Sequence, residues 1–302
     1  MGKYSIGLDL GGTNLRAAAI DAEGRILDKV AGTTKLSEGR EAVVADMVAA
    51  IAELRRRCGE RDLAGVGVGV PGFIIMEKGE IADSPNLPGF KDFPIRDEIS
   101  RQLGATVILE NDANAAALGE KWMGAGRDVD DLVLLTLGTG IGGGIICGGK
   151  VLHGFVGMAA ELGHTTVNPT GNPCGCGNRG CLEKHASATA VTAMAKLMGL
   201  GDNLSSEAVY DLATAGEEKA RFVFQVMGEA LGIALANFCN AFNFPLYLLS
   251  GGMLPAWPFF APAMLAECER RYFIYRATRP RIEKALLGNE AGLFGAACLP
   301  FF

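Results

Sequence analysis

Residues 4–31 read YSIGLDLGGTNLRAAAIDAEGRILDKVA, and residues 131–153 read DLVLLTLGTGIGGGIICGGKVLH. Each stretch predicts an apolar strand, a turn containing glycine and threonine, a second strand, a glycine turn and a third strand. The two stretches begin about 130 residues apart, which is far longer than the period of a solenoid repeat. We therefore expect a duplicated α/β fold in which each half offers one Gly/Thr turn.

The segments between and after these stretches complete this expectation. Apolar residues at helical or strand spacing predict the remaining elements. The expected strands are 64–70, 106–109 and 245–249, and the expected helices are 41–57, 95–103, 113–122, 184–198, 217–242, 256–271 and 290–298. No flexible linker separates the halves, and we expect the chain to cross between them near residues 112 and 113.

The composition narrows the class of protein. The chain has 302 residues, with 28 Lys plus Arg against 34 Asp plus Glu, a net charge of −6. Nucleic acids and anionic membranes both reward a basic surface, so we expect neither as a partner. No apolar run approaches the ~18 residues of a spanning helix, and the N-terminus does not resemble a signal peptide. A cytoplasmic location is expected.

The two Gly/Thr turns predict a nucleotide site. Gly138, Gly140 and Gly142 follow a strand as in a dinucleotide-binding fingerprint, but that motif needs a helix next. Here residues 144–147 predict a further strand, and a hairpin without any ligand is the alternative. The turn after Asp9 favours phosphate, because exposed N–H groups bind phosphate and a nearby carboxylate helps to hold Mg²⁺. Two such turns suggest a nucleoside triphosphate held across a cleft.

A cluster of cysteines predicts a metal site. Three of the eight cysteines lie within eight residues, and a histidine precedes them: His164, Cys174, Cys176 and Cys181. One His and three Cys can hold a tetrahedral Zn²⁺, and four protein ligands leave no open position, so this zinc would be structural. Three free thiols in a polar loop are the alternative interpretation.

Carboxylates near these motifs are candidates for proton transfer and hydroxyl recognition. Asp112 follows Asn111 at a strand end, where it can accept a proton from a substrate hydroxyl. Capping of the next helix is an equally ordinary role for an Asp there. Glu161 and Glu183 flank the cysteine cluster, and simple surface charge is their alternative role. His153 and His185 are expected to be ordinary polar residues.

Taken together, the motifs resemble the ROK family (repressor, open reading frame, kinase). The resemblance rests on DLGGTNLR, PGFI, PNLPGF, LENDANAAALGE, LGTGIGGGII, ELGH with CGCGNRGCLE, and LSGG, and it spans residues 4 to about 297. It implies an actin-like ATPase fold (ribonuclease H-like, hexokinase-like), with two α/β domains flanking a cleft. The domains would comprise residues 1–112 plus 285–302 and residues 113–284. ATP with Mg²⁺ in the cleft and a homodimer are also implied.

The resemblance also implies residue roles. Asp112 would be the general base. The sugar contacts would be Gly72, Asn86, Asn111, Asp112, Glu161, His164 and Glu183. The ATP contacts would be Asp9, Gly11, Gly12, Thr13, Gly138, Thr139, Gly140, Gly251 and Gly252. His164 would serve both zinc and sugar.

The chain begins at the first strand without a preceding helix-turn-helix, which favours the family's sugar kinases over its repressors. We expect ATP-dependent phosphorylation of a hexose, D-glucose being the first candidate. N-acetylmannosamine, fructose, allose and N-acetylglucosamine are alternative acceptors, and a sugar-sensing binding protein without catalysis is the alternative of another class.

Overall fold

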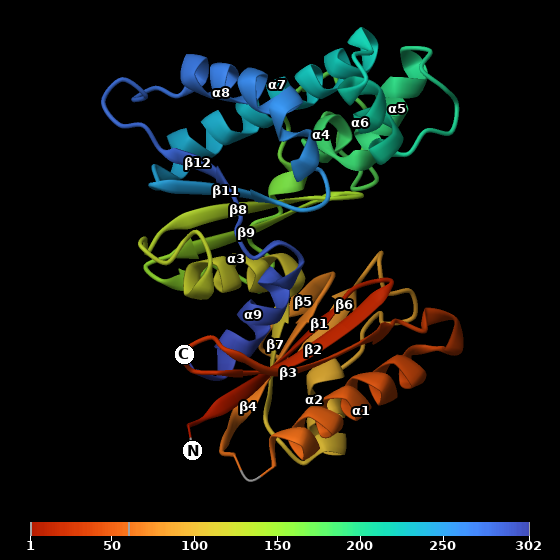
Figure 1. Cartoon of the computed structure of the whole chain (residues 1–302), viewed down its shortest axis with the longest axis vertical. Coiled ribbons are helices and arrows are strands. Elements are labelled where there is room, and N and C mark those ends of the chain that lie inside the picture. Colours follow the sequence, from red (N-terminus) through yellow and green to blue (C-terminus); the bar gives the residue numbers. More distant parts are fainter. Residues whose placement is uncertain (1, 60, 302) are drawn as a thin grey trace. The chain divides into compact units, whose positions relative to one another are not determined.

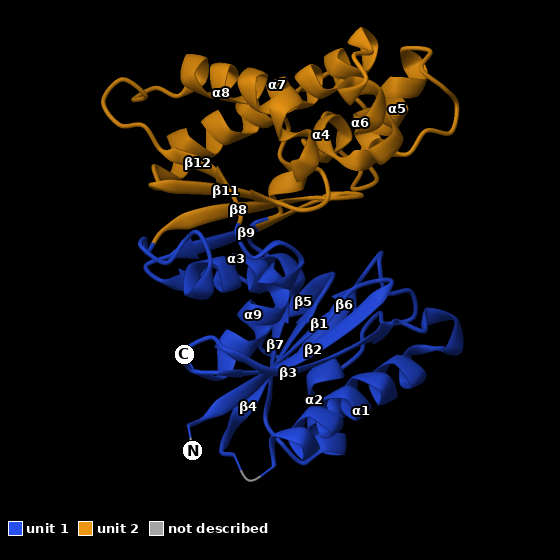
Figure 2. Ribbon diagram, in the orientation of Figure 1, with its two compact units in different colours: residues 1–130, 144–160, 286–302 blue, residues 131–143, 161–285 orange. Residues whose placement is uncertain are grey.

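The computed structural model describes residues 2–59 and 61–301 (Figure 1). The chain forms two compact units (Figure 2). Unit 1 contains residues 1–130, 144–160 and 286–302, and unit 2 contains residues 131–143 and 161–285. The predicted crossing at residues 112 and 113 differs from this division, because helix α3 (Asp112–Met123) packs within unit 1.

Unit 1 is built on a five-stranded mixed sheet of order β3-β2-β1-β4-β7. Its strands are β1 (Tyr4–Leu10), β2 (Asn14–Asp21), β3 (Ile26–Thr33), β4 (Leu63–Val70) and β7 (Val107–Asn111). The first three form an antiparallel meander, whereas β1, β4 and β7 run parallel to one another. A separate antiparallel pair joins β5 (Phe73–Ile75) to β6 (Glu80–Asp83).

The alternation of side chains along β2 separates two apolar layers. Ala17 and Ala19 face the cluster made with α1 (Arg40–Cys58) and α2 (Ile95–Leu103). Ala18 and Ile20 face the opposite cluster, which contains residues of α9 (Ala291–Cys298). Successive residues of a strand point to opposite faces, so an alanine-rich strand accommodates helices closely on both sides.

Glycine permits the close crossing of α3 and α9. A Cβ on Gly295 would overlap the carbonyl group of Ala115, and one on Gly119 would overlap that of Ala291. This contact anchors α3, and with it the residue that starts the helix, on the sheet of unit 1.

Unit 2 contains the central strands of the second sheet and five helices. The sheet has the order β10-β9-β8-β11-β12, and β8, β11 and β12 are parallel. The strands are β8 (Leu132–Leu137), β9 (Ile141–Cys147), β10 (Lys150–Val151), β11 (Leu246–Ser250) and β12 (Arg281–Lys284). The helices are α4 (Glu183–Ala186), α5 (Ala188–Leu197), α6 (Ser206–Thr214), α7 (Glu218–Phe242) and α8 (Trp257–Arg271).

Helix α7 is long and apolar enough to cross a membrane by length and composition alone. However, 67% of the most apolar 18-residue window of α7 is buried inside the protein, and α7 packs along α8. A core helix has the same composition, because it meets apolar neighbours on most sides.

The duplicated three-strand pattern predicted from the sequence is confirmed by β1-β2-β3 and β8-β9-β10. The predicted helix 184–198 is wrong in one respect, because it is broken at Ser187, whose hydroxyl caps α5 by accepting from the Ala190 N–H. Sequence periodicity missed the short elements β5, β6, β12 and α6. The cap of α6, Ser205, is the signal that identifies that helix, since serine before an apolar run is typical of a helix start. Single-turn 3₁₀ helices complete the chain at Leu36–Glu38, Leu162–His164, Leu254–Ala256, Gly288–Glu290 and Leu299–Phe301.

The α3–α9 crossing provides a test of the fold. Gly295→Ala is expected to lower the free energy of unfolding by about 1–3 kcal/mol, because a methyl group must push two packed backbones apart. Gly32→Ala is the matched control, since a Cβ there meets nothing within 4 Å. Urea denaturation of both variants measures the difference, and equal stabilities would contradict this account of the crossing.

Candidate functional site

In unit 1, three parallel strands end at one edge of the sheet and bring several predicted site residues together. Asp9 lies near the end of β1, Gly72 follows β4, and Asn111 ends β7. The Asn111 side chain donates from Nδ2 to the carbonyl oxygen of Gly72 at 3.2 Å. The Gly11–Gly12–Thr13 turn approaches Asn86, because a Cβ on Gly12 would lie 3.1 Å from the Asn86 carbonyl oxygen. Ligands of open α/β sheets bind at such carboxyl ends.

The structure separates the roles of Asn111 and Asp112 at the start of α3. Asn111 is the cap, and its Oδ1 accepts from the N–H groups of Ala113 and Asn114 at 2.9 and 3.2 Å. Asp112 is the first helical residue, and one of its carboxylate oxygens, Oδ1, accepts from the Ala113 N–H at 2.9 Å. The capping interpretation therefore applies to Asn111, and the Asp112 carboxylate is not needed as the cap.

Two carboxylates at this edge have unusual proton affinity. Burial and the negative charge of Asp112 raise the pKa of Asp9 to about 6, against a smaller lowering by Arg16. Burial also raises the pKa of Asp112, opposed by the Ala113 N–H. Paired carboxylates with raised pKa values are typical of sites that handle a proton or a cation.

In unit 2, two glycine turns lie side by side at the carboxyl ends of β8 and β11. A Cβ on Gly251 (φ 100°) would overlap the backbone of Leu137, and the Met253 N–H donates to the Leu137 carbonyl at 3.2 Å. The pair Gly251–Gly252 therefore adjoins the turn Gly138–Thr139–Gly140. A strand and not a helix follows that turn, which excludes the dinucleotide fingerprint considered above.

The start of α5 supports the Gly138–Gly140 turn. The Ala188 N–H donates to the Gly138 carbonyl at 2.8 Å, and the Thr189 hydroxyl donates to the Thr139 carbonyl at 2.7 Å. Gly138 has room for a Cβ, whereas a Cβ on Gly140 would collide with the Glu183 carboxylate. Of these two glycines, only Gly140 is confined by a neighbouring side chain, that of Glu183.

Glu183 links this turn to the cysteine loop. Its Oε2 accepts from the Ile141 N–H at 3.2 Å, and it lies two residues after Cys181. The segment between Glu161 and His164 approaches the same strand, since a Cβ on Gly163 would overlap the Ile141 carbonyl. The structure therefore brings Glu183, and the short segment that contains Glu161 and His164, to the beginning of β9.

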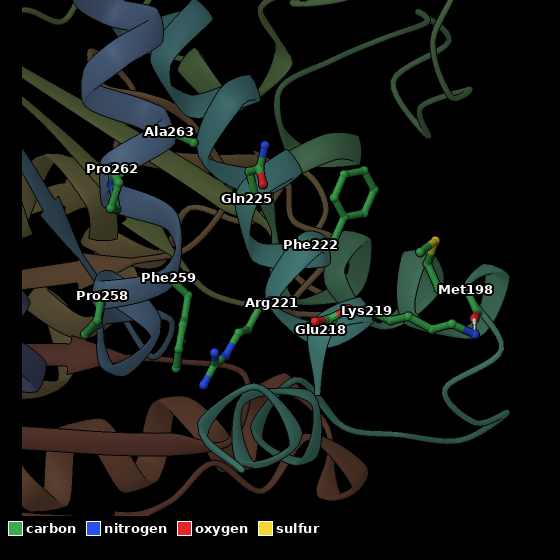
Figure 3. Close-up of a pocket in the computed structure, with 10 residues that line it drawn as sticks. All are labelled: Met198, Glu218, Lys219, Arg221, Phe222, Gln225, Pro258, Phe259, Pro262 and Ala263. Atoms are coloured by element: carbon green, nitrogen blue, oxygen red, sulfur yellow. Dashed lines mark hydrogen bonds between the residues drawn. The ribbon is translucent and has the colours of Figure 1, made fainter. Parts of the chain in front are cut away.

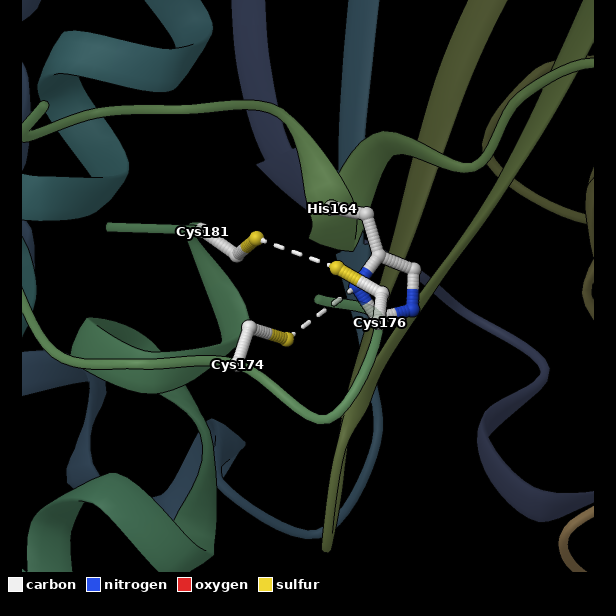
Figure 4. Close-up of side chains that lie close together, drawn as sticks. All are labelled: His164, Cys174, Cys176 and Cys181. Atoms are coloured by element: carbon white, nitrogen blue, oxygen red, sulfur yellow. Dashed lines mark hydrogen bonds between the residues drawn. The ribbon is translucent and has the colours of Figure 1, made fainter. Parts of the chain in front are cut away.

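The predicted metal ligands converge (Figure 4). Their four ligand atoms lie within 4.8 Å of one another, with 3.5 Å from Cys174 Sγ to His164 Nδ1 and 3.7 Å between the sulfurs of Cys176 and Cys181. Neighbouring ligands of a tetrahedral Zn²⁺ lie about 3.5–3.8 Å apart, given its ~2.1–2.3 Å bonds. Burial raises the pKa of the Cys181 thiol to about 12, so a bound cation is what would make it a thiolate. The donor set fits zinc.

The sequence predicts only an ordinary polar role for His153 and no role for Glu110, but the structure pairs these two residues. Glu110 is 1% exposed, and its Oε2 lies 2.7 Å from Nε2 of His153. The hydrogen bond from the imidazole to Glu110 raises the pKa of His153. The signal in the sequence was a carboxylate in a strand beside Asn111, but its partner lies 43 residues away and only the fold reveals it.

Unit 2 also has a hollow of about 760 Å³ between the first turns of α7 and α8 (Figure 3). Its lining includes none of the predicted site residues. The Arg221 guanidinium there donates to the Ala213 carbonyl and lies over the Phe259 ring. The lining residues are Met198, Glu218, Lys219, Arg221, Phe222, Gln225, Pro258, Phe259, Pro262 and Ala263.

The raised pKa of Asp9 predicts a stability effect. The folded state binds this proton more tightly than the unfolded chain, so stability should fall as the pH rises from about 4 through 6. Asp9→Asn should therefore raise the free energy of unfolding at pH 7.5, by up to about 3 kcal/mol, and change it little at pH 4. Urea titrations at both pH values measure this. Asp202→Asn, at a largely exposed carboxylate, is the control, and an equal gain at both pH values would contradict the assignment.

Comparison with known proteins identifies the family. Residues 5–300 match the ROK family. A glucokinase of Thermotoga maritima is 37% identical over 97% of this chain and 96% of its own. The crystal structure of a ROK hexokinase from Thermus thermophilus is 39% identical, with a TM-score of 0.89 over 97% of this chain and 96% of that one. A ROK glucokinase from Streptomyces griseus, solved with glucose and AMPPNP, is 34% identical with a TM-score of 0.80, and the match covers 98% of each chain.

Relatives with other functions are also similar. A xylose repressor of Caldicellulosiruptor bescii is 30% identical over 97% of this chain, which spans 77% of the repressor. The predicted actin-like, hexokinase-like fold is confirmed, and the structure adds that both of its five-stranded sheets are mixed. Motifs, fold and relatives agree, and the chain belongs to the ROK family, whose glucokinases are among its similar relatives.

Proposed function

We propose that this protein transfers the γ-phosphoryl group of ATP to the 6-hydroxyl of D-glucose. The observation that carries the proposal is the pair of carboxylates, Asp9 and Asp112, whose pKa values are raised at the sheet edge next to a Gly/Thr turn. Glucokinases among the relatives, one of them solved with glucose and AMPPNP, support glucose and ATP as the ligands.

In this reaction the sugar oxygen bonds to the γ-phosphorus while the bond from that phosphorus to the β,γ-bridging oxygen breaks, and ADP leaves. Asp112 accepts the hydroxyl proton. Its raised pKa favours this role, because a base works best when its proton affinity lies near the working pH. Phosphoryl transfer otherwise needs positioning and neutralisation of charge rather than covalent chemistry by the protein.

The sugar hydroxyls are the proposed partners of side chains from both units. In unit 1 these are Asn86, Asn111 and Asp112, with the Gly72 backbone held by Asn111. In unit 2 they are Glu161, His164 and Glu183. His164 can serve both zinc and sugar, since Nδ1 faces the thiols and leaves Nε2 for a hydroxyl.

The phosphates of ATP are assigned to Gly11, Gly12 and Thr13 in unit 1 and to Gly138, Thr139 and Gly140 in unit 2. Gly251 and Gly252 would lie near the adenosine, because they adjoin the second turn. Mg²⁺ bound with ATP would neutralise phosphate charge, and the Asp9 carboxylate is the proposed group that orients it. The exposed N–H groups of both turns would supply further positive potential.

Zinc at His164, Cys174, Cys176 and Cys181 is proposed as a structural ion. The loop is rich in Gly, Pro and Asn and has few apolar residues of its own, so metal binding would supply part of its folding energy. All four positions of a tetrahedral ion would be filled by protein, which leaves none for substrate.

The acceptor sugar and the class of protein are tested together. The repressor relatives make a sugar sensor without catalysis the second candidate, and an N-acetyl-D-glucosamine kinase among the relatives makes that sugar a second acceptor. A coupled ADP assay should be run with glucose, N-acetylmannosamine, fructose, allose and N-acetylglucosamine. We expect glucose to give the highest kcat/KM, whereas calorimetric sugar binding without ADP release would support the sensor.

A homodimer and a cytoplasmic location are also proposed. Sedimentation tests whether the protein is a homodimer.

Asp112→Asn tests the base. The amide keeps the shape of the side chain but cannot take a proton, so we expect kcat to fall by about 10²-fold or more while glucose affinity stays within about tenfold. Activity and calorimetry measure these two quantities on one preparation. Substantial kcat in the variant would remove Asp112 from the proton-accepting role.

Cys176→Ala tests the metal. Loss of the ion should loosen Glu161 and Glu183 and weaken glucose binding at least about tenfold. Binding of AMPPNP should weaken less, although the Glu183 contact with the Ile141 N–H passes some of the change to the nearby turn. Cys147→Ala, at an exposed cysteine outside the cluster, is the matched control. Elemental analysis should find about one zinc per chain in the control, and a metal-free protein of full activity would refute the proposal.

A further inference from the structure

Glu110 is a buried carboxylate directly before the two residues proposed to face the sugar. Strand alternation would place its side chain on the same face as Ile108, which is 36% exposed, yet Glu110 is 1% exposed. A buried carboxylate without partners costs several kcal/mol. Its retention therefore depends on the groups that surround it.

Both oxygens of Glu110 have partners. Oε1 accepts from the Asn111 N–H at 2.9 Å and from Nδ2 of Asn114 at 3.1 Å. Oε2 pairs with Nε2 of His153 at 2.7 Å. Oδ1 of Asn114 has no hydrogen-bond partner within residues 2–59 and 61–301, so the contact from Glu110 is what orients that amide.

These contacts enclose the turn on which Asp112 stands. Glu110 holds the backbone N–H of Asn111 on one side of Asp112 and the Asn114 side chain on the other. Asn111 in turn accepts from the N–H of Asn114. Asn111, directly before Asp112, and Asn114, two residues after it, are therefore both tied to one carboxylate.

His153 lies outside the sheet to which Glu110 belongs, and its side chain reaches Glu110 from there. It follows β10, its side chain is 38% exposed, and its carbonyl accepts from the Ala159 N–H at 3.1 Å. The loop is anchored further by Gly157 (φ 98°), where a Cβ would collide with Met76. A fixed loop thus delivers an imidazole N–H to a buried acceptor.

We propose that Glu110 and His153 are positioning residues for the reaction. They hold the backbone at Asn111 and Asp112 so that the Asp112 carboxylate meets the acceptor hydroxyl. This inference rests on the proposed function. His153 acts through its hydrogen bond to Glu110, and neither residue needs to touch the substrate.

The proposal predicts a separation of catalysis from binding. A base must lie within about 2.6–3.2 Å of the proton that it takes, and a displacement of about 1 Å can cost 10²-fold in rate. Sugar affinity is shared among several side chains and should respond less. A loss of general stability would instead lower both quantities together.

The experiment compares His153→Ala with His153→Gln, whose amide nitrogen can still donate to Glu110. We expect kcat to fall at least about tenfold in His153→Ala, with the Kd for glucose within about threefold, and kcat to recover to within about threefold of the original in His153→Gln. Phe155→Ala, at a fully exposed side chain of the same loop, is the control and should keep the original kcat.

Two measurements that do not depend on activity accompany the kinetics. Hydrogen exchange should be faster at the amides of Asn111 and Asn114 in His153→Ala than in His153→Gln. The NMR titration of His153 should shift to lower pH in Glu110→Gln, since the carboxylate raises the pKa of His153. Original kcat in His153→Ala, equal impairment of both His153 variants, or unchanged exchange and titration would each overturn the proposal. A protein that turns over none of the sugars contradicts the proposed function instead. The exchange and titration data would still decide whether Glu110 and His153 hold the backbone at Asn111 and Asp112.

Discussion

The parallel pairing of β1, β4 and β7 is the constraint on which the site of unit 1 depends. Parallel strands end at the same edge of a sheet, so residues far apart in the sequence meet there: Asp9, Gly72 and Asp112. The cost of this arrangement is electrostatic, because Asp9 is buried beside the charge of Asp112. Burial also raises the pKa of Asp112, so both carboxylates favour binding a proton or a cation.

Close helix packing holds that edge of the sheet in place. Gly119 and Gly295 let α3 and α9 approach at backbone distance, and Gly7 and Gly67 allow α9 the same approach to the sheet. A helix held in this way cannot shift without breaking contacts with both the sheet and its partner helix. Asp112, at the first position of α3, therefore inherits its placement from the core of unit 1.

In unit 2, a cluster of candidate metal ligands takes the place that close helix packing has in unit 1. The segment from His164 to Cys181 has little apolar side-chain volume, and its four candidate ligands replace a core with a compact donor cluster. Glu183 extends this cluster to the Gly138–Gly140 turn through the Ile141 N–H. The residues proposed for sugar and for phosphate in this unit thus share one framework.

The sequence by itself determined the duplicated strand-turn-strand pattern, the His and Cys ligand set and the family, because each is written in local spacing or in motifs of adjacent residues. It also identified Asp112 and the glycine turns as positions whose residue types could carry chemistry. Only the tertiary structure decided that Asn111 caps α3 and leaves Asp112 free of that role, that Gly140 but not Gly138 is confined by Glu183, and that His153 is the partner of Glu110. These facts depend on contacts between residues distant in the chain, and a pattern of local periodicity carries no information about which distant side chain will cover a buried charge.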